Sequence, residues 1–239
     1  MVTSVDGRES IPVGAETPRE VCEFLKKLVI ETNAKTTLEV GLAFGLSAMS
    51  ICEGLQQIGG EGHIAIDPNQ STQWKGIGLE NLKRAGFTDL LELREKPSHV
   101  ALPELAAEGL RVDFAYIDGW HTFDYALLDF FYVDLMLNVG GIVAVDDCFF
   151  SSVHAVCRYI ATNRAYCVRA VCECDVPHPA SLAARVLKAA AARSPKFRRV
   201  VHPRFSQPDE KLGFTRFSRC IAFEKLAADS RTWDAHVDS

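Results

Sequence analysis

Apolar residues recur along the chain in two alternating patterns, one typical of amphipathic helices and one typical of short buried strands. In residues 18–33 they return every three or four positions, which predicts a helix. A short apolar run at 37–41 follows and ends in glycine, as a buried strand before a turn does. The same succession then repeats, with strands predicted at 62–67, 90–93, 112–118 and 140–145, and helices at 47–55, 76–85, 99–108, 123–137 and 151–162.

Strands that alternate with helices predict an α/β fold, in which a mostly parallel sheet is covered by helices on both faces. Further strands at 166–172 and 219–223 bring the expected sheet to seven strands. We expect a single domain over residues 1–239 with its binding core at about 35–147. Residues 175–215, which include an alanine-rich helix at 182–193, are expected to form an insertion over the site. Ligands of such folds bind at the carboxyl ends of the strands.

The composition excludes some classes of partner. A formal net charge of -5 argues against a nucleic-acid partner, which would require a basic surface, and favours a small-molecule ligand. No apolar run approaches the roughly 20 residues of a membrane span, so we expect no membrane and a cytoplasmic location. The residues Cys22, Cys52, Cys148, Cys157 and Cys167 are expected to be buried thiols, because the eight cysteines form no tight ligand framework. A zinc site at the C-x-C pair 172–174 is the alternative.

The segment 39–45 reads Glu-Val-Gly-Leu-Ala-Phe-Gly and lies directly after the first strand. Its glycines allow the backbone to approach a ligand where a strand gives way to a helix. The G-x-G-x-x-G pattern of dinucleotide-binding oxidoreductases is missing. Because a carboxylate precedes the first glycine, the turn suits a ligand with a positively charged amino acid end. A tight turn without a ligand is the alternative.

Asp67 ends the second strand, 22 residues beyond Gly45. A carboxylate at this place in an α/β sheet can accept hydrogen bonds from both hydroxyls of a ribose. With the glycine turn, Asp67 therefore indicates an adenosyl ligand.

Acidic residues follow the fourth and fifth strands, as Asp118 in the segment Asp-Gly-Trp-His and as the pair Asp146 and Asp147. Neighbouring parallel strands end close together, so the three carboxylates should converge. Three close carboxylates repel one another unless a cation joins them, and hard oxygen ligands favour Mg²⁺, Ca²⁺ or Mn²⁺ over zinc. The alternative is that Asp118 and Asp146 cap helices or orient the backbone, with no metal.

A neutral imidazole at His121 can accept a proton near pH 7, so His121 is a candidate general base. A packed structural histidine is the alternative, given the aromatic residues around it. Phe149, Phe150 and His154 follow the acid pair and are candidates for the wall of a substrate pocket, with core packing as their alternative.

Together these residues resemble the class I S-adenosylmethionine-dependent methyltransferases, over about residues 35–145. The resemblance implies a Rossmann-like fold, in which the glycine turn lines the methionyl end of the cofactor. The acid after the second strand would hold the ribose, and the turn after the third strand the adenine. The implied cofactor-binding residues are Glu39, Gly41, Gly45, Ser47, Asp67, Ser98 and Asp118.

The acidic pattern is similar to that of the metal-dependent small-molecule O-methyltransferases, including those that methylate catechols and the sugars of macrolide or aminocoumarin natural products. This resemblance implies a divalent cation, most readily Mg²⁺, at Asp118, Asp146 and Asp147, with Asp118 and His121 as catalytic residues. The predicted activity is O-methylation of a small molecule. A cofactor-binding protein of the same fold without catalysis is the alternative. An amphipathic helix near the N-terminus also makes a homodimer plausible.

Overall fold

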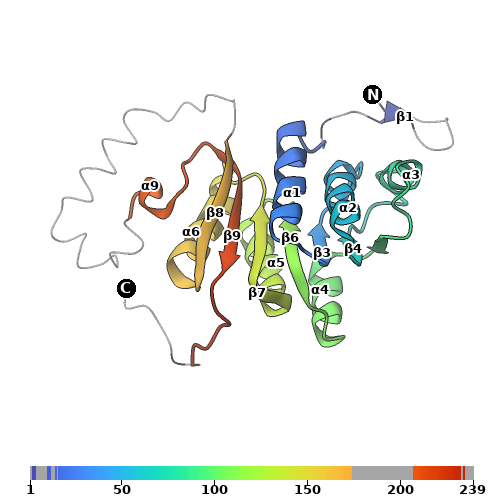
Figure 1. Ribbon diagram of the computed structural model, residues 1–239. Helices are drawn as coiled ribbons and strands as arrows, with labels where there is room; N and C mark the ends of the chain where they lie inside the picture. The colour runs from blue at the N-terminus through green and yellow to red at the C-terminus, as the bar shows by residue number, and fades with distance from the viewer. Residues whose placement is uncertain are drawn as a thin grey trace.

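The computed structural model describes residues 16–173 and 207–232, together with residues 2–3, 10–11, 14 and 234. Its strands are β1 (Val2–Thr3), β2 (Ser10–Ile11), β3 (Thr36–Val40), β4 (Gly62–Ile66), β5 (Leu91–Arg94), β6 (Val112–Ile117), β7 (Leu137–Val145), β8 (Tyr166–Glu173) and β9 (Ser218–Lys225). Seven of them form one sheet in the order β5-β4-β3-β6-β7-β9-β8, and β1 pairs with β2 (Figure 1). Strands β3 to β7 run parallel, while β9 is antiparallel to both neighbours. The predicted mostly parallel, seven-stranded sheet is confirmed.

Helices cover both faces of the sheet. They are α1 (Arg19–Glu31), α2 (Leu46–Ile58), α3 (Ile77–Arg84), α4 (Ser98–Ala107), α5 (Phe123–Met136), α6 (Ser151–Asn163) and the short α9 (Asp209–Leu212). In β6, Phe114 and Tyr116 belong to the core cluster of α1 and α2, whereas Ala115 and Ile117 belong to that of α4, α5 and α6. This alternation is the period of two that sends successive side chains to opposite faces. Each large apolar side chain buried there contributes about 2 kcal/mol.

Strand β7 begins at Leu137, three residues before the predicted start at residue 140. Val112 pairs with Leu137 and Phe114 with Ile142, so the register shifts between the two pairs. The shift accommodates the exposed residues 138–140, where Gly140 has a φ of +85°. The chain therefore enters the sheet directly from α5.

Two sequence expectations about the C-terminal part have different outcomes. The predicted helix 182–193 and most of the predicted insertion 175–215 lie outside the described residues, and α9 falls in the last part of that range. The single domain over residues 1–239 stays a prediction. In the described part of the chain, no helix combines the length and hydrophobicity that crossing a bilayer requires.

The cysteines are buried at the positions where the sheet and helices enclose them. Cys52, Cys148 and Cys157 are buried, as expected, whereas Cys22 of α1 is only half-buried. The expectation for Cys167 is wrong, because this residue is exposed on β8, which forms the edge of the sheet. Cys174 lies outside the described residues, so the zinc alternative at the C-x-C pair has no structural outcome.

Candidate functional site

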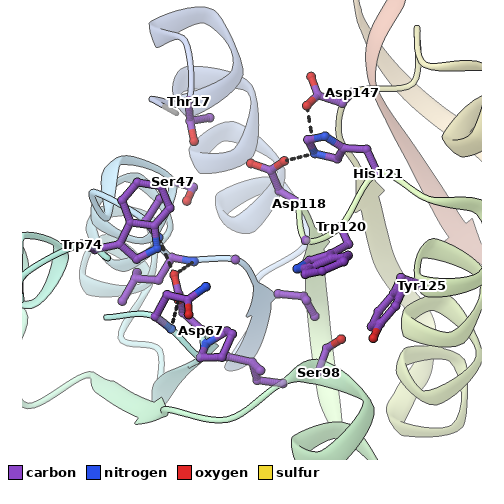
Figure 2. Close-up of a pocket in the computed structure, with 18 of the residues that line it drawn as sticks. Thr17, Ser47, Asp67, Trp74, Ser98, Asp118, Trp120, His121, Tyr125 and Asp147 are labelled. Atoms are coloured by element: carbon purple, nitrogen blue, oxygen red, sulfur yellow. Dashed lines mark hydrogen bonds and ion pairs between the residues drawn. The ribbon is translucent and has the colours of Figure 1, made fainter. Parts of the chain in front are cut away.

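A cavity of about 600 Å³ lies at the carboxyl ends of the parallel strands. Residues that follow five successive strands along the chain contribute to its wall: Gly41 after β3, Asp67 after β4, Ser98 after β5, Asp118 after β6 and Asp147 after β7. Figure 2 shows the side chains of Asp67, Ser98, Asp118 and Asp147, which come from separate elements. Open α/β sheets bind their ligands at this end.

The glycine turn depends on a close approach between two strands. Gly41 has a φ of +96°, and a Cβ atom there would lie 2.2 Å from the carbonyl oxygen of Asp118. The backbone N–H of Asp118 in turn donates to the carbonyl of Val40 at 2.9 Å. Only glycine combines this conformation with this spacing, so the turn brings the ends of β3 and β6 together at the cavity.

Asp67 holds the glycine turn as well as facing the cavity. Its Oδ2 atom accepts hydrogen bonds from the backbone N–H groups of Leu42 at 3.1 Å and Ala43 at 2.8 Å, and from Gln70 Nε2 at 3.2 Å. Its Oδ1 atom accepts one, from the N–H of Asn69 at 2.8 Å. The carboxylate is 4% exposed. Oδ1 therefore has more remaining capacity for a ligand hydroxyl than Oδ2 has.

Two of the predicted cofactor residues, Glu39 and Gly45, do not line the cavity. Glu39 is fully buried, where its Oε2 atom accepts a hydrogen bond from Ser47 Oγ at 2.9 Å and its Oε1 atom lies 3.3 Å from His63 Nε2. Gly45 is the N-cap of α2, with a φ of +77°. Glu39 thus orients Ser47, which does line the cavity together with Gly41, Asp67, Ser98 and Asp118.

Aromatic side chains line the cavity near Ser98 and Asp67. The rings of Trp120 and Tyr125 lie 5.0 Å apart at 31°. Trp74, for which the sequence offered no argument, packs edge-on against Phe44 at 5.3 Å. In Figure 2, Trp74 appears on one side of Asp67, and Trp120 and Tyr125 on the other. These flat surfaces suit a planar ring.

A buried carboxylate, Asp129 of α5, lies beneath this part of the wall. It is fully buried, and a Cβ atom on Gly119 would lie 3.2 Å from its Oδ2 atom. Burial raises the pKa of Asp129 to about 6, and the nearby Ser98 opposes the shift, although neither carboxylate oxygen has a hydrogen-bond partner among the described residues. Asp129 therefore supports two residues of the cavity wall, Ser98 and Gly119, from behind.

An acidic cluster, formed by Asp118, His121 and Asp147, occupies another part of the wall. His121 Nε2 lies 3.0 Å from Asp147 Oδ2 and 3.5 Å from Asp118 Oδ1. Among the described residues, this is the group whose possible metal-ligand atoms all lie within 4.8 Å of one another. The hydrogen bond to Asp118 raises the pKa of His121, and the charge of Asp147 adds to that effect against the cost of burial.

Asp146 is set apart from this cluster, although it was predicted with Asp118 and Asp147. The hydroxyl of Tyr116 donates to Asp146 Oδ2 at 2.6 Å and lies 3.3 Å from Asp118 Oδ2. Burial raises the pKa of Asp146 to about 7, and the charge of Asp118 adds to the shift. Asp147 has a φ of +52°, which turns the chain directly after the buried Asp146. Asp147 therefore reaches the cavity with His121, whereas Asp146 faces Tyr116.

The residues Phe149, Phe150 and His154 were predicted either to line a substrate pocket or to pack in the core. Phe149, Phe150 and His154 do not line the cavity. The Phe150 ring stacks on His121 at 5.2 Å and 17°, and its side chain is exposed. His154 is buried, with Nε2 3.1 Å from Asp209 Oδ2. Phe150 therefore supports the acidic cluster, while His154 ties α6 to α9.

Sequence reasoning also missed Tyr116 and Arg219. Tyr116 was one apolar position of a strand, and its hydroxyl has no sequence signal. Arg219 is the second residue of β9 and lines the cavity beside Asp147. Only the antiparallel pairing of β9 with β7 brings it there, and that pairing joins residues 76 to 82 positions apart.

A family model described as a methyltransferase domain matches residues 38–148, from β3 to the end of β7. Residues 38–148 are thus similar to a methyltransferase domain. Two relatives of the chain are a probable caffeoyl-CoA O-methyltransferase 2 of Dictyostelium discoideum and a tapetum-specific methyltransferase 1 of Arabidopsis thaliana. The first is 31% identical over 137 residues, 55% of each chain, and the second 33% over 129 residues, 52% of this chain and 51% of the relative. The matched part thus spans about half the length of these relatives.

Among solved structures, the methyltransferase fold recurs in an O-methyltransferase from Bacillus cereus in complex with SAH. The TM-score is 0.62 at 15% sequence identity, and the likeness covers 90% of this chain and 84% of the other. The O-methyltransferase TomG from Streptomyces achromogenes, in complex with SAM, gives a TM-score of 0.54 at 16% identity over 88% of this chain and 82% of its own. The predicted Rossmann-like methyltransferase fold is confirmed.

Proposed function

We propose that this chain is an S-adenosylmethionine-dependent methyltransferase that methylates a hydroxyl oxygen of a small molecule with the help of a divalent cation. The observation that carries the proposal is that the glycine turn and the acidic cluster of Asp118, His121 and Asp147 line one cavity. Groups suited to binding the methyl donor and groups suited to removing a proton are therefore adjacent. The similarity to proteins named as O-methyltransferases supports oxygen as the acceptor atom.

We assign the methyl donor to the wall formed by the glycine turn. Gly41 and Ser47 would hold its methionyl end, and Asp67 Oδ1 a ribose hydroxyl. Ser98 and Trp120 would hold the adenine, which the ring of Trp120 can cover. Asp118 lies between this wall and His121, and so belongs to both parts of the site.

The acidic cluster fits a hard divalent cation. Two carboxylates and an imidazole approach one another within 4.8 Å, and carboxylate oxygens are the ligands that Mg²⁺ and Mn²⁺ prefer. We assign the cation to Asp118 and Asp147. The hydroxyl of Tyr116 connects Asp118 to Asp146, which lies next to this site. When bound, such a cation lowers the pKa of an acceptor hydroxyl.

The residues of the chain position the acceptor and remove its proton. The acceptor oxygen attacks the sulfonium methyl group in line, so that an O–C bond forms as the C–S bond breaks and the sulfonium becomes a neutral thioether. The hydroxyl proton passes to Nδ1 of His121, because Nε2 faces Asp147 and Asp118 and donates its own hydrogen to them. Because these two carboxylates raise the pKa of His121, they stabilise the imidazolium that the proton transfer creates. Holding the reactants in line supplies much of the remaining rate.

Three expectations about the surroundings of the enzyme stay predictions. They are a cytoplasmic location, the absence of a nucleic-acid partner and assembly as a homodimer.

Transfer of an isotope-labelled methyl group from S-adenosylmethionine to a panel of hydroxylated small molecules tests the proposed function. We expect turnover by the wild type that falls when divalent cations are chelated. His121→Gln should lower kcat by about a hundredfold or more, because a general base contributes on that scale. Asp124→Asn, an exposed change on α5 outside the cavity, serves as the control and should retain full activity. Binding of the methyl donor without transfer to any acceptor would instead indicate a protein without catalysis.

A further inference from the structure

A positively charged residue of the cavity, Arg219, has no part in the mechanism above. Among the described residues that line the cavity, Arg219 is the one lysine or arginine. Its side chain is 26% exposed, so part of it is accessible to a molecule in the cavity. A permanent positive charge beside carboxylates at a binding site requires an explanation, because arginine keeps its charge at any working pH.

Arg219 is held in place by its strand and its neighbours. The backbone N–H of Cys148 donates to the Arg219 carbonyl at 2.8 Å, next to the β7–β9 pairing of Val145 with Ile221. The guanidinium lies 5.8 Å from the ring centroid of Phe149. Both contacts fix the position of the charge relative to the end of β7.

The guanidinium and the imidazole of His121 lie on either side of one carboxylate. Asp147 Oδ2 is 3.0 Å from His121 Nε2, and Asp147 Oδ1 is 3.5 Å from Arg219 Nη2. Arg219 Nε is also 3.6 Å from Asp146 Oδ1. The proposed proton acceptor and the fixed cation therefore contact different oxygens of one carboxylate, so one small molecule can reach both.

Aromatic rings connect the same two groups. Phe150 stacks on His121 at 5.2 Å, and its neighbour Phe149 lies 4.7 Å away from it, near Arg219. Phe150 is 43% exposed, although its ring is apolar. An exposed aromatic surface beside a binding cavity favours contact with a flat apolar group.

We propose that Arg219 binds a carboxylate of the methyl acceptor, and that the acceptors are hydroxylated aromatic acids. This inference rests on the proposed function and specifies its substrate class. The acceptor hydroxyl lies at His121, its ring near Phe150, and its carboxylate against the guanidinium, whose planar fork matches carboxylate geometry. Arg219 is thus a residue that determines specificity, separate from the proton-accepting group.

Two acceptors that differ only by a carboxylate test this assignment: catechol and 3,4-dihydroxybenzoate. We expect the wild type to give a higher kcat/KM with the acid, by about tenfold or more, since a hydrogen-bonded charge pair is worth that factor. Arg219→Met should remove most of this preference, because it should lower the kcat/KM for the acid far more than the kcat/KM for catechol. Arg219→Lys keeps a point charge without the fork, and should retain part of the preference.

Arg216→Met, an exposed arginine three residues earlier that does not line the cavity, is the matched control and should behave as the wild type. Titration of 3,4-dihydroxybenzoate into the protein saturated with S-adenosylhomocysteine measures acceptor binding without turnover. It should show the same loss in Arg219→Met, with unchanged affinity for S-adenosylhomocysteine. Thermal melting verifies that each variant is folded.

Equal kcat/KM values for the two acceptors in the wild type would overturn the assignment. So would an equal loss for both in Arg219→Met, which would make Arg219 a counter-ion of Asp146 and Asp147. Weaker binding of S-adenosylhomocysteine by Arg219→Met would also overturn it, because Arg219 would then hold the methyl donor. If no acceptor is methylated, the proposed function fails. Binding of the acid that depends on Arg219 in the titration would still support the anion site in that case, and a lack of such binding would reject the anion site.

Discussion

At the scale of single residues, the cavity is shaped by groups that bring backbone segments together as much as by groups that face a ligand. Asp67 accepts backbone N–H groups of the glycine turn, and Glu39 orients Ser47 from a buried position. Gly41 allows β3 and β6 to approach at their ends. The shape of the site therefore depends on residues whose effects on binding and on stability are coupled.

Replacing Gly41 by alanine should destabilise the fold and weaken cofactor binding. An alanine at this φ costs about 1 kcal/mol or more, and the clash of its Cβ with the Asp118 carbonyl adds about 2 kcal/mol. Urea unfolding measures the expected loss of about 3 kcal/mol in the free energy of unfolding. Gly59→Ala is the matched control, because Gly59 has a φ of +64° with no atom within 4 Å of the added Cβ. It should lose only about 1 kcal/mol, and equal losses in the two variants would contradict the proposed close approach.

At the scale of elements, α5 joins the cavity wall to the core. Its buried face belongs to the cluster that covers one side of the sheet, and Asp129 is a charged residue on that face. This carboxylate lies close to Gly119, and neither of its oxygens has a hydrogen-bond partner among the described residues. The ionised form of Asp129 is therefore unfavourable in the folded protein.

Asp129→Asn should remove a pH dependence of stability between about pH 4 and pH 6. The pKa of Asp129 is raised from about 4 in the unfolded chain to about 6 in the folded protein. The folded state thus binds the proton more tightly, and its contribution to stability, fully present below pH 4, is lost as the pH rises through 6. Two pKa units correspond to about 3 kcal/mol as an upper value.

Urea unfolding of wild type and Asp129→Asn at pH 4 and pH 7 provides the measurement. The free energy of unfolding of Asp129→Asn, relative to that of the wild type, should be higher at pH 7 than at pH 4. Asp124→Asn, an exposed change on the same helix, should show the opposite trend, because a hydrogen bond with Thr122 lowers the pKa of Asp124. An Asp129 variant that is more destabilised at pH 7 than at pH 4 would show that the carboxylate has a stabilising partner.

The elements themselves were largely predictable, because hydrophobic periodicity follows directly from which face of a strand or helix is buried. The parallel strands and the helices between them lie within three residues of the predicted bounds, and the start of β7 is the one end of a parallel strand that departs by more than one residue. A register shift opposite Val112 produces that exception. Such a shift depends on the partner strand, so local periodicity does not contain it.

The site was predictable where residues follow strands and unpredictable where a side chain must be oriented. The sequence placed Asp118, Asp146 and Asp147 near one another, but the turn at Asp147 separates it from Asp146. Arg219 reaches the cavity through pairing between β7 and β9, which no local pattern indicates. Trp74 had no signal either, since its place in the wall depends on the packing of Phe44.

At the scale of the whole molecule, the order of strands explains why one cavity can serve both binding and chemistry. The chain runs outward through β3, β4 and β5, and then returns beside β3 as β6 and β7. The carboxyl ends of β3 and β6 therefore border the crevice where the direction of winding reverses. The glycine turn follows β3 and the acidic cluster follows β6 and β7, so the topology brings the two together.

Calorimetric titration of the purified protein with S-adenosylmethionine, beside a parallel titration with NAD⁺, tests the central claim most directly. We expect one binding site per chain for S-adenosylmethionine and no heat of binding for NAD⁺. The affinity for S-adenosylmethionine should fall at least tenfold in Asp67→Ala. Asp67→Ala removes the carboxylate that holds the glycine turn, whereas the exposed Asp124→Asn should bind as the wild type does. Absence of S-adenosylmethionine binding by a folded wild type, or binding of NAD⁺ in its place, would contradict the account.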